Sequence, residues 1–191
     1  TPGGRPVAMV HCNNGSSELD AWMQMFREIL GAVGAEDADL YTKLFQKSLE
    51  GDSDCGGLLL YNYIAGEHIT GVSEGRPLLV RKPENKLSLA NFMRSQICGT
   101  MASLALGNRI LKDEQVQIRQ LTGHGGLFKT PGVAQRYLAA AMNSPVTVMT
   151  TAGEGGPYGM ALLAAYMANK AENESLEEYL NAHVFANAKG T

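Results

Sequence analysis

The chain has 191 residues, of which 45% are hydrophobic and 18% are charged, a composition typical of a folded domain and too apolar for a disordered chain. Its formal net charge of −3 gives no electrostatic support for binding to nucleic acid or to an acidic membrane surface. A run of about 18 apolar residues, which a membrane-spanning helix needs, does not occur. We therefore expect one domain over residues 1–191 that binds neither nucleic acid nor membranes.

The predicted elements alternate between strands and helices. Short apolar runs bounded by turn residues predict strands, and apolar residues at every third or fourth position predict helices. In chain order, the predicted elements are a strand at 6–12, helices at 17–30 and 37–49, a strand at 57–64, a helix at 88–111, a strand at 116–121, a helix at 131–142, a strand at 146–149, a helix at 158–169 and a short helix that begins at the capping box of Ser175. This alternation is typical of a layered α/β domain. Because the first residues contain no initiator methionine and no signal peptide, we expect a piece of a longer protein.

The cysteines and histidines indicate neither a disulfide framework nor a metal site. Cys12, Cys55 and Cys98 are odd in number and widely spaced, and no Cys-x-x-Cys motif occurs. The adjacent pair His11 and Cys12 is a poor candidate for a catalytic dyad, because neighbouring residues on a strand point to opposite faces. This pattern indicates a reducing compartment, and we expect a cytoplasmic protein with no metal ligands.

The strongest local motif is the glycine-rich stretch at 123–126, which joins a predicted strand to a predicted helix. Glycines allow a ligand to approach the backbone closely, and the N-terminus of a helix attracts anions. Phe128 stands where both a P-loop and a dinucleotide-binding fingerprint would need glycine. The stretch is therefore typical either of a nucleotide or phosphate site of another kind or of a tight turn that binds nothing.

Two other loops carry acidic residues. Asp54 begins an Asp-Cys-Gly-Gly stretch similar to a phosphate-binding hairpin, but it follows a helix and precedes a strand, so we interpret it as a solvated turn. Glu67, in the long connection after the strand at 57–64, could bind a sugar hydroxyl or serve only as a turn residue. The small residues of the helix at 158–169 predict close packing against a sheet.

Four motifs follow one another along the chain: Ala65-Gly66-Glu67, then Arg-Ser-Gln-Ile-Cys-Gly at 94–99, then Gly-Gly-Leu-Phe-Lys-Thr at 125–130, then Gly-Met-Ala-Leu-Leu-Ala at 159–164. Their order and spacing resemble the C-terminal half of the FGGY carbohydrate kinases. That family has a Gly-Glu motif, a helix that contains roughly Arg-Ala-x-x-Glu-Gly, a Gly-Gly loop and a Gly-Ala-Ala-x-x-Ala helix. The resemblance covers nearly the whole chain and is greatest to the xylulokinase-like and ribulokinase-like members.

The resemblance implies a ribonuclease-H-like, actin-type ATPase lobe with a mixed sheet flanked by helices. The loop at 125–127 matches the segment that passes close to the nucleotide, Thr130 matches a polar position beside the adenine, and 15–17 resemble a second nucleotide-side turn. The residues that the resemblance places beside the nucleotide are Gly15, Ser16, Ser17, Gly125, Gly126, Leu127 and Thr130.

The implied reaction is transfer of the ATP γ-phosphate to a hydroxyl of a ketose such as xylulose, with Mg²⁺ neutralising the phosphates. Such kinases have two lobes, and no residue here matches the family's catalytic aspartate or its phosphate hairpin. The resemblance therefore implies that the general base lies in an N-terminal lobe outside this chain and that the chain alone is inactive. Its implied partners are ATP, a sugar and that lobe, and a homodimer is allowed.

Three departures from the family pattern leave the sugar unassigned. Cys98 stands where the family has a glutamate, Ser95 replaces the usual alanine, and His124 occupies a position that is often Gly or Asp. Two other functions stay open. One is a non-catalytic actin-like nucleotide-binding or regulatory module. The other is a nucleotide-dependent oxidoreductase, which the missing third glycine disfavours.

Overall fold

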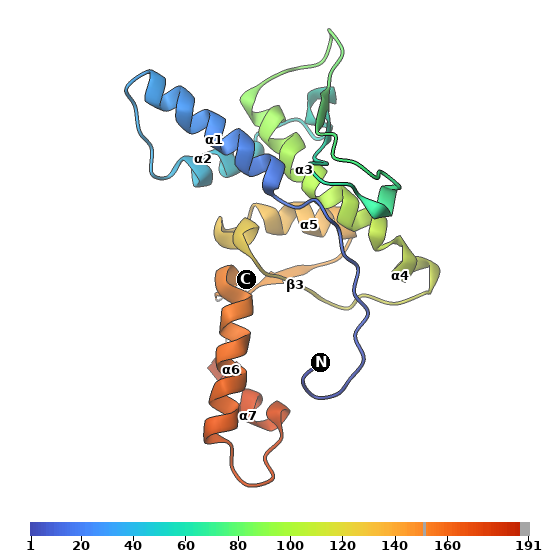
Figure 1. Ribbon diagram of the computed structural model, residues 1–191, viewed down its shortest axis with the longest axis vertical. Coiled ribbons are helices and arrows are strands. Elements are labelled where there is room, and N and C mark those ends of the chain that lie inside the picture. Colours follow the sequence, from blue (N-terminus) through green and yellow to red (C-terminus); the bar gives the residue numbers. More distant parts are fainter. Residues whose placement is uncertain (151, 188–191) are drawn as a thin grey trace.

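Helix α3 (Leu89–Gly107) forms the centre of the computed structural model, which describes residues 1–150 and 152–187 (Figure 1). Buried side chains occur on all sides of α3, as expected of a helix that other elements surround. Helices α2 (Leu40–Ser48) and α5 (Ala134–Met142) pack against it most extensively. The core of the molecule therefore lies around this one helix.

The other described elements agree in type with most of the predicted ones. They are the helices α1 (Ser17–Ala32), α4 (Arg109–Asp113), α6 (Gly155–Asn169) and α7 (Leu176–His183), the strands β1 (Leu59–Tyr61), β2 (Leu78–Val80), β3 (Leu121–Gly123) and β4 (Val146–Val148), and the 3₁₀ turns η1 (Cys55–Gly57), η2 (His68–Thr70), η3 (Gly126–Lys129), η4 (Ala152–Glu154) and η5 (Phe185–Asn187). The capping box of α7 is confirmed: Ser175 Oγ accepts from the Glu178 backbone N–H at 3.2 Å, and the Glu178 carboxylate accepts from the Ser175 backbone N–H at 2.8 Å.

The described strands form two separate two-stranded sheets, so the single mixed sheet that was expected is not seen. Strand β1 pairs antiparallel with β2, which places Leu60 opposite Leu79. Strand β3 pairs parallel with β4, which places Leu121 opposite Val146. A parallel pair needs a crossover connection, and α5 provides it here. The α/β class is confirmed.

The predicted strand at 6–12 is wrong, and the predicted strand at 116–121 is wrong except for its last residue. Val7 is 69% exposed and Met9 is 84% exposed, and the N-terminal segment runs as an extended chain beside the body (Figure 1). A strand needs a neighbour that pairs with its backbone N–H and C=O groups. Among the described residues, no strand lies beside 6–12, and β4 pairs only with 121–123.

Local backbone bonds explain two differences in helix bounds. The predicted helix at 88–111 divides into α3 and α4 at Asn108, whose backbone N–H and side-chain Nδ2 both donate to the Leu104 carbonyl, at 3.0 Å and 2.9 Å. The helix predicted to begin at Pro131 begins three residues later, because Gly132 has a φ of 75° that an α-helix does not accommodate. The glycine-rich stretch therefore leads into η3 and only then into α5.

Helices α6 and α7 project from the rest of the molecule as a hairpin (Figure 1). Helix α6 packs mainly against α7 and η4, and the described side chains of α6 include no buried one, so the predicted packing of its small residues on a sheet is wrong. Met160 and Met167 are 69% and 78% exposed. In the described part of the chain, no helix combines the length and apolar character needed to cross a membrane.

Truncating the Phe45 side chain tests how much the stability of the fold depends on the packing of α2 against the core. Its side chain is fully buried, and its ring stacks on Tyr41 with 4.4 Å between ring centres. We expect Phe45→Ala to lower the free energy of unfolding by about 3–5 kcal/mol, because it leaves a cavity. Urea denaturation measures the change.

Val33→Ala is the control, because Val33 is 73% exposed and its truncation should change stability by no more than about 0.5 kcal/mol. Equal losses in the two variants would contradict the assigned core.

Candidate functional site

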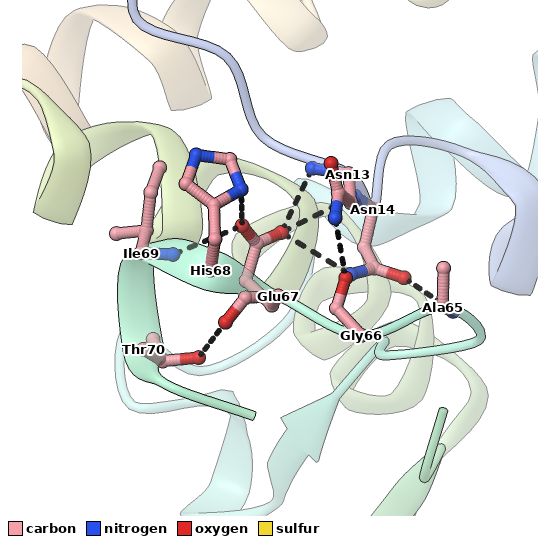
Figure 2. A network of polar contacts seen from close by, with 8 residues as sticks. All are labelled: Asn13, Asn14, Ala65, Gly66, Glu67, His68, Ile69 and Thr70. Atoms are coloured by element: carbon pink, nitrogen blue, oxygen red, sulfur yellow. Dashed lines mark hydrogen bonds and ion pairs between the residues drawn. The ribbon is translucent and has the colours of Figure 1, made fainter. Parts of the chain in front are cut away.

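The carboxylate of Glu67 is fully buried and joins the turn at 13–15 to the loop after β1 (Figure 2). Its Oε2 accepts from the backbone N–H groups of Asn13 at 3.0 Å and Asn14 at 3.3 Å, and from Asn14 Nδ2 at 3.1 Å. Its Oε1 accepts from the Ile69 backbone N–H at 3.4 Å. Hydrogen bonds to an ionised group are about twice as strong as neutral ones. One carboxylate therefore fixes two segments that lie far apart in the sequence.

The hydrogen bonds to Glu67 also determine its ionisation. Burial by itself raises the pKa of the carboxyl group, but the bonds from Asn14, Ile69 and Asn13 together outweigh burial and hold the pKa of Glu67 below its ordinary value. The group is therefore ionised at neutral pH. In this position the Glu67 carboxylate orders the turn at 13–15. Contact of Glu67 with a sugar hydroxyl, the other role expected from the sequence, stays a prediction.

Two buried side chains hold the turn from its other side. Asn62 Nδ2 donates to the Gly15 carbonyl at 3.0 Å, and Thr100 Oγ1, on α3, donates to the same oxygen at 3.3 Å. Helix α1 begins directly after this turn, at Ser17. The central helix therefore sets the place where α1 starts.

The glycine-rich stretch forms the opposite wall of the site. Strand β3 ends at Gly123, and Gly125 has a φ of 105°, a conformation that only glycine adopts without strain. A Cβ atom added at Gly126 would meet nothing within 4 Å, so the space in front of this backbone is open. A ligand can therefore approach the backbone at Gly125 and Gly126 closely.

Gly15 and Ser16, at the end of the turn, and the glycine-rich stretch line one cleft of about 690 Å³. This volume lies in the range of about 300–1,000 Å³ that is common for small-molecule sites. The lining residues are Gly15, Ser16, Asp20, Tyr41, Thr42, His124, Gly125, Gly126, Leu127 and Lys129.

The cleft has an acidic side and a basic side. Asp20 comes from the first turn of α1 and Tyr41 from α2, and burial first and the charge of Asp20 second raise the pKa of Tyr41 to about 12. The phenol is therefore a hydrogen-bond donor at neutral pH. Lys129 forms an exposed ion pair with Glu154 at 2.9 Å, and such a pair stabilises by only about 0–1 kcal/mol, so the ammonium group is available to an anion.

The described residues offer little to a metal ion. Within 1–150 and 152–187, no group of three or more His, Cys, Asp and Glu side chains is placed to hold one. Of the described residues that line the cleft, only Asp20 carries a carboxylate. Mg²⁺ sites commonly use one or two carboxylates together with substrate phosphates, so a phosphate-bound metal fits this cleft better than a metal held by the protein alone.

A comparison with protein families decides the class of the molecule. Residues 1–168 match the model of the C-terminal domain of the FGGY family of carbohydrate kinases. The chain belongs to this family. No curated protein gives a significant match to this FGGY chain.

Solved kinases share the fold of this FGGY chain. The xylulose kinase from Rhodospirillum rubrum is 14% identical with a TM-score of 0.64, over 94% of this chain and 33% of that one. The gluconate kinase from Lactobacillus acidophilus is 18% identical with a TM-score of 0.62, again over 94% and 33%. The glycerol kinase from Plasmodium falciparum, solved with ADP, is 16% identical with a TM-score of 0.60, over 87% and 31%.

These neighbours show that the chain has an actin-like ATPase fold, as the resemblance implied. The chain spans between 31% and 33% of the length of these three solved kinases.

The cleft of the FGGY chain brings together most of the residues that the sequence placed beside a nucleotide. Gly15 and Ser16 lie on one wall, and the loop at 125–127 lies on the other. Ser17 is exposed as the first residue of α1 and does not line the cleft. Thr130 is buried and lines a neighbouring cavity of about 410 Å³, which Lys129 also lines. Nucleotide contact by any of them stays a prediction.

Sequence reasoning did not place five of the lining residues beside a nucleotide: Asp20, Tyr41, Thr42, His124 and Lys129. A basic residue just after a glycine loop was a usable signal for Lys129. Asp20 lies in the predicted helix at 17–30, and Tyr41 and Thr42 lie in the predicted helix at 37–49. Asp20, Tyr41 and Thr42 come together at the cleft only because α2 lies beside the start of α1 in the folded chain.

Glu67→Gln tests the buried carboxylate. We expect the variant to lose about 2–4 kcal/mol of unfolding free energy at pH 7, because an amide cannot satisfy all the N–H donors that converge on it. Glu74→Gln is the matched control in the same connection, because the exposed pair of Glu74 with Arg76 contributes at most about 1 kcal/mol. Urea denaturation of both variants gives the comparison.

The pH dependence gives a second readout of the same pair of variants. The folded-state pKa of Glu67 is lowered, so its contribution to stability is present above its ordinary pKa and is lost as pH falls through the folded-state value. The difference between the wild type and Glu67→Gln should therefore shrink in acid. A difference that stays constant down to acid pH would contradict an ionised Glu67.

Proposed function

We propose that this chain is the nucleotide-binding lobe of an ATP-dependent carbohydrate kinase and that the cleft between Gly15 and Gly126 holds ATP. One observation carries the proposal. Two segments that lie far apart in the sequence line the same cleft. The resemblance to the family places each of these segments beside a nucleotide. Family membership supports the class of reaction, and the glycerol kinase neighbour solved with ADP supports the class of ligand.

The charges of the cleft orient the nucleotide. Phosphates are attracted to Lys129 and repelled by Asp20, so we assign the phosphate chain to the open backbone at Gly125 and Gly126 and the nucleoside to the opposite end. There the Asp20 carboxylate can accept a hydrogen bond from a ribose hydroxyl or an exocyclic amine. The Tyr41 ring, which stacks on the core, offers a flat apolar surface to the base.

In the proposed reaction, the oxygen of a sugar hydroxyl attacks the γ-phosphorus and the bond from that phosphorus to the bridging oxygen breaks, so that ADP leaves. The proton of the hydroxyl passes to a general base, which we assign to an N-terminal lobe outside this chain. Mg²⁺, when bound, neutralises charge on the phosphates. Its ligands would be mainly phosphates and water, because the described residues include no carboxylate cluster.

For the acceptor, we propose a ketose such as xylulose. The support is that several of the structural neighbours are xylulose kinases, although a gluconate kinase and a glycerol kinase share the fold. We place the reaction in the cytoplasm, where three free cysteines persist as thiols. A panel of ketoses and polyols tests the substrate.

The division of labour between lobes predicts a difference between two forms of the protein. The chain alone should bind ATP weakly and phosphorylate no sugar, whereas a longer form that includes an N-terminal lobe should do both. Titration calorimetry and a coupled ADP-release assay measure these properties. Sugar phosphorylation by the chain alone would overturn the proposed location of the base. A longer form that binds ATP but phosphorylates no sugar would favour a regulatory module.

Gly126→Asp tests the assigned phosphate loop in the longer form. The variant should raise the KM for ATP by about tenfold or more, because two like charges about 4 Å apart repel by about 4 kcal/mol at the dielectric constant of a protein surface. Gly126→Ala, which adds a methyl group into open space, and Gly3→Asp, which adds the same charge at a glycine that does not line the cleft, are the controls. An unchanged KM in Gly126→Asp would show that the loop does not face the phosphates.

A further inference from the structure

Cys55 and Cys98 are free cysteines whose side chains meet at the edge of the core. Cys55 is 8% exposed and opens η1, and Cys98 is half-buried on α3, against which η1 packs. A hydrogen bond joins the two thiols. Cys98 therefore keeps part of its surface in contact with solvent.

The segment that carries Cys55 is fixed to α3 by polar contacts. Asn91 Oδ1 accepts from the Asp52 backbone N–H at 2.7 Å, and Asn91 Nδ2 donates to Asp52 Oδ2 at 3.0 Å. Asn91 and Cys98 are seven positions apart on the helix, so they lie on the same face. The loop at 51–57 is therefore held over the face of α3 that presents Cys98.

The groups around the pair make the two thiols unequal. Arg94 on α3, Asp54 on the loop and Tyr137 on α5 are the charged and titratable neighbours. The hydrogen bond from Cys55 first, and the charge of Arg94 second, lower the pKa of Cys98 to about 7 against the effect of burial. The same hydrogen bond and burial raise the pKa of Cys55. Thiolates are the reactive form, so Cys98 is the nucleophile of the pair.

We propose that Cys98 and Cys55 form a peroxide-reactive pair, in which Cys98 is oxidised first and Cys55 converts it to a disulfide. The Cys98 thiolate attacks one oxygen of hydrogen peroxide, the O–O bond breaks, and the hydroxide that leaves takes up a proton as water. The sulfur of Cys55 then attacks the Cys98 sulfenic acid, the S–O bond breaks, and the second hydroxide leaves as water with the Cys55 proton. Two thiols are oxidised to one disulfide, and one peroxide is reduced to two waters.

The third cysteine provides an internal reference. Burial first, and the charge of Glu67 second, raise the pKa of Cys12, so its thiol is mostly protonated and reacts slowly. A reaction with peroxide that follows thiolate content should therefore spare Cys12.

The test is treatment of the wild-type chain with hydrogen peroxide, alkylation of the remaining thiols with N-ethylmaleimide, and peptide mapping by mass spectrometry. We expect a cross-link between the peptides of Cys55 and Cys98 and an alkylated Cys12. Iodoacetamide alkylation of Cys98 in the untreated chain should be half-maximal at a lower pH than alkylation of an ordinary thiol, and Arg94→Gln should move that midpoint upward.

Matched serine variants separate the two steps. Cys55→Ser should stop at a sulfenic acid on residue 98 that dimedone traps, Cys98→Ser should leave Cys55 reduced, and Cys12→Ser should form the disulfide at the wild-type rate. Three results in the wild-type chain would each overturn the proposal: no cross-link after peroxide treatment, a cross-link through Cys12, or alkylation of Cys98 at the pH of an ordinary thiol.

Discussion

The buried carboxylate of Glu67 is the interaction on which the geometry of the cleft depends. Four N–H groups converge on it, three from Asn13 and Asn14 and one from Ile69. A buried charge is costly unless it is fully hydrogen-bonded, and here the bonds are sufficient to lower its pKa despite burial. The turn at 13–15 therefore has one position, and α1 starts from that position.

Helix α3 supplies the second constraint. Thr100 on α3 donates a hydrogen bond to the Gly15 carbonyl, and α5 packs against the same helix and also contacts β4 and η3. Contacts with one central helix therefore position both walls of the cleft, although the residues of the two walls lie far apart in the sequence. The family assignment and the shared cleft both support a nucleotide lobe.

Periodicity and capping in the sequence predict the helices well, because a helix satisfies its own backbone groups. The strands are predicted less well, since a strand forms only where a partner lies beside it; the apolar run at 6–12 has none among the described residues. Glycine clusters locate the loop at 125–127. Asp20 and Tyr41 could not be predicted, because their position at the cleft arises only when α2 packs beside the start of α1.

The central claim is that the turn at 13–15 and the loop at 125–127 together form the nucleotide site. A crystal structure of the longer kinase with a non-hydrolysable ATP analogue tests this claim most directly. The account predicts the phosphates against the backbone of Gly125 and Gly126, and the nucleoside between Ser16 and Tyr41. An analogue bound with no contact to either of the two segments would contradict it.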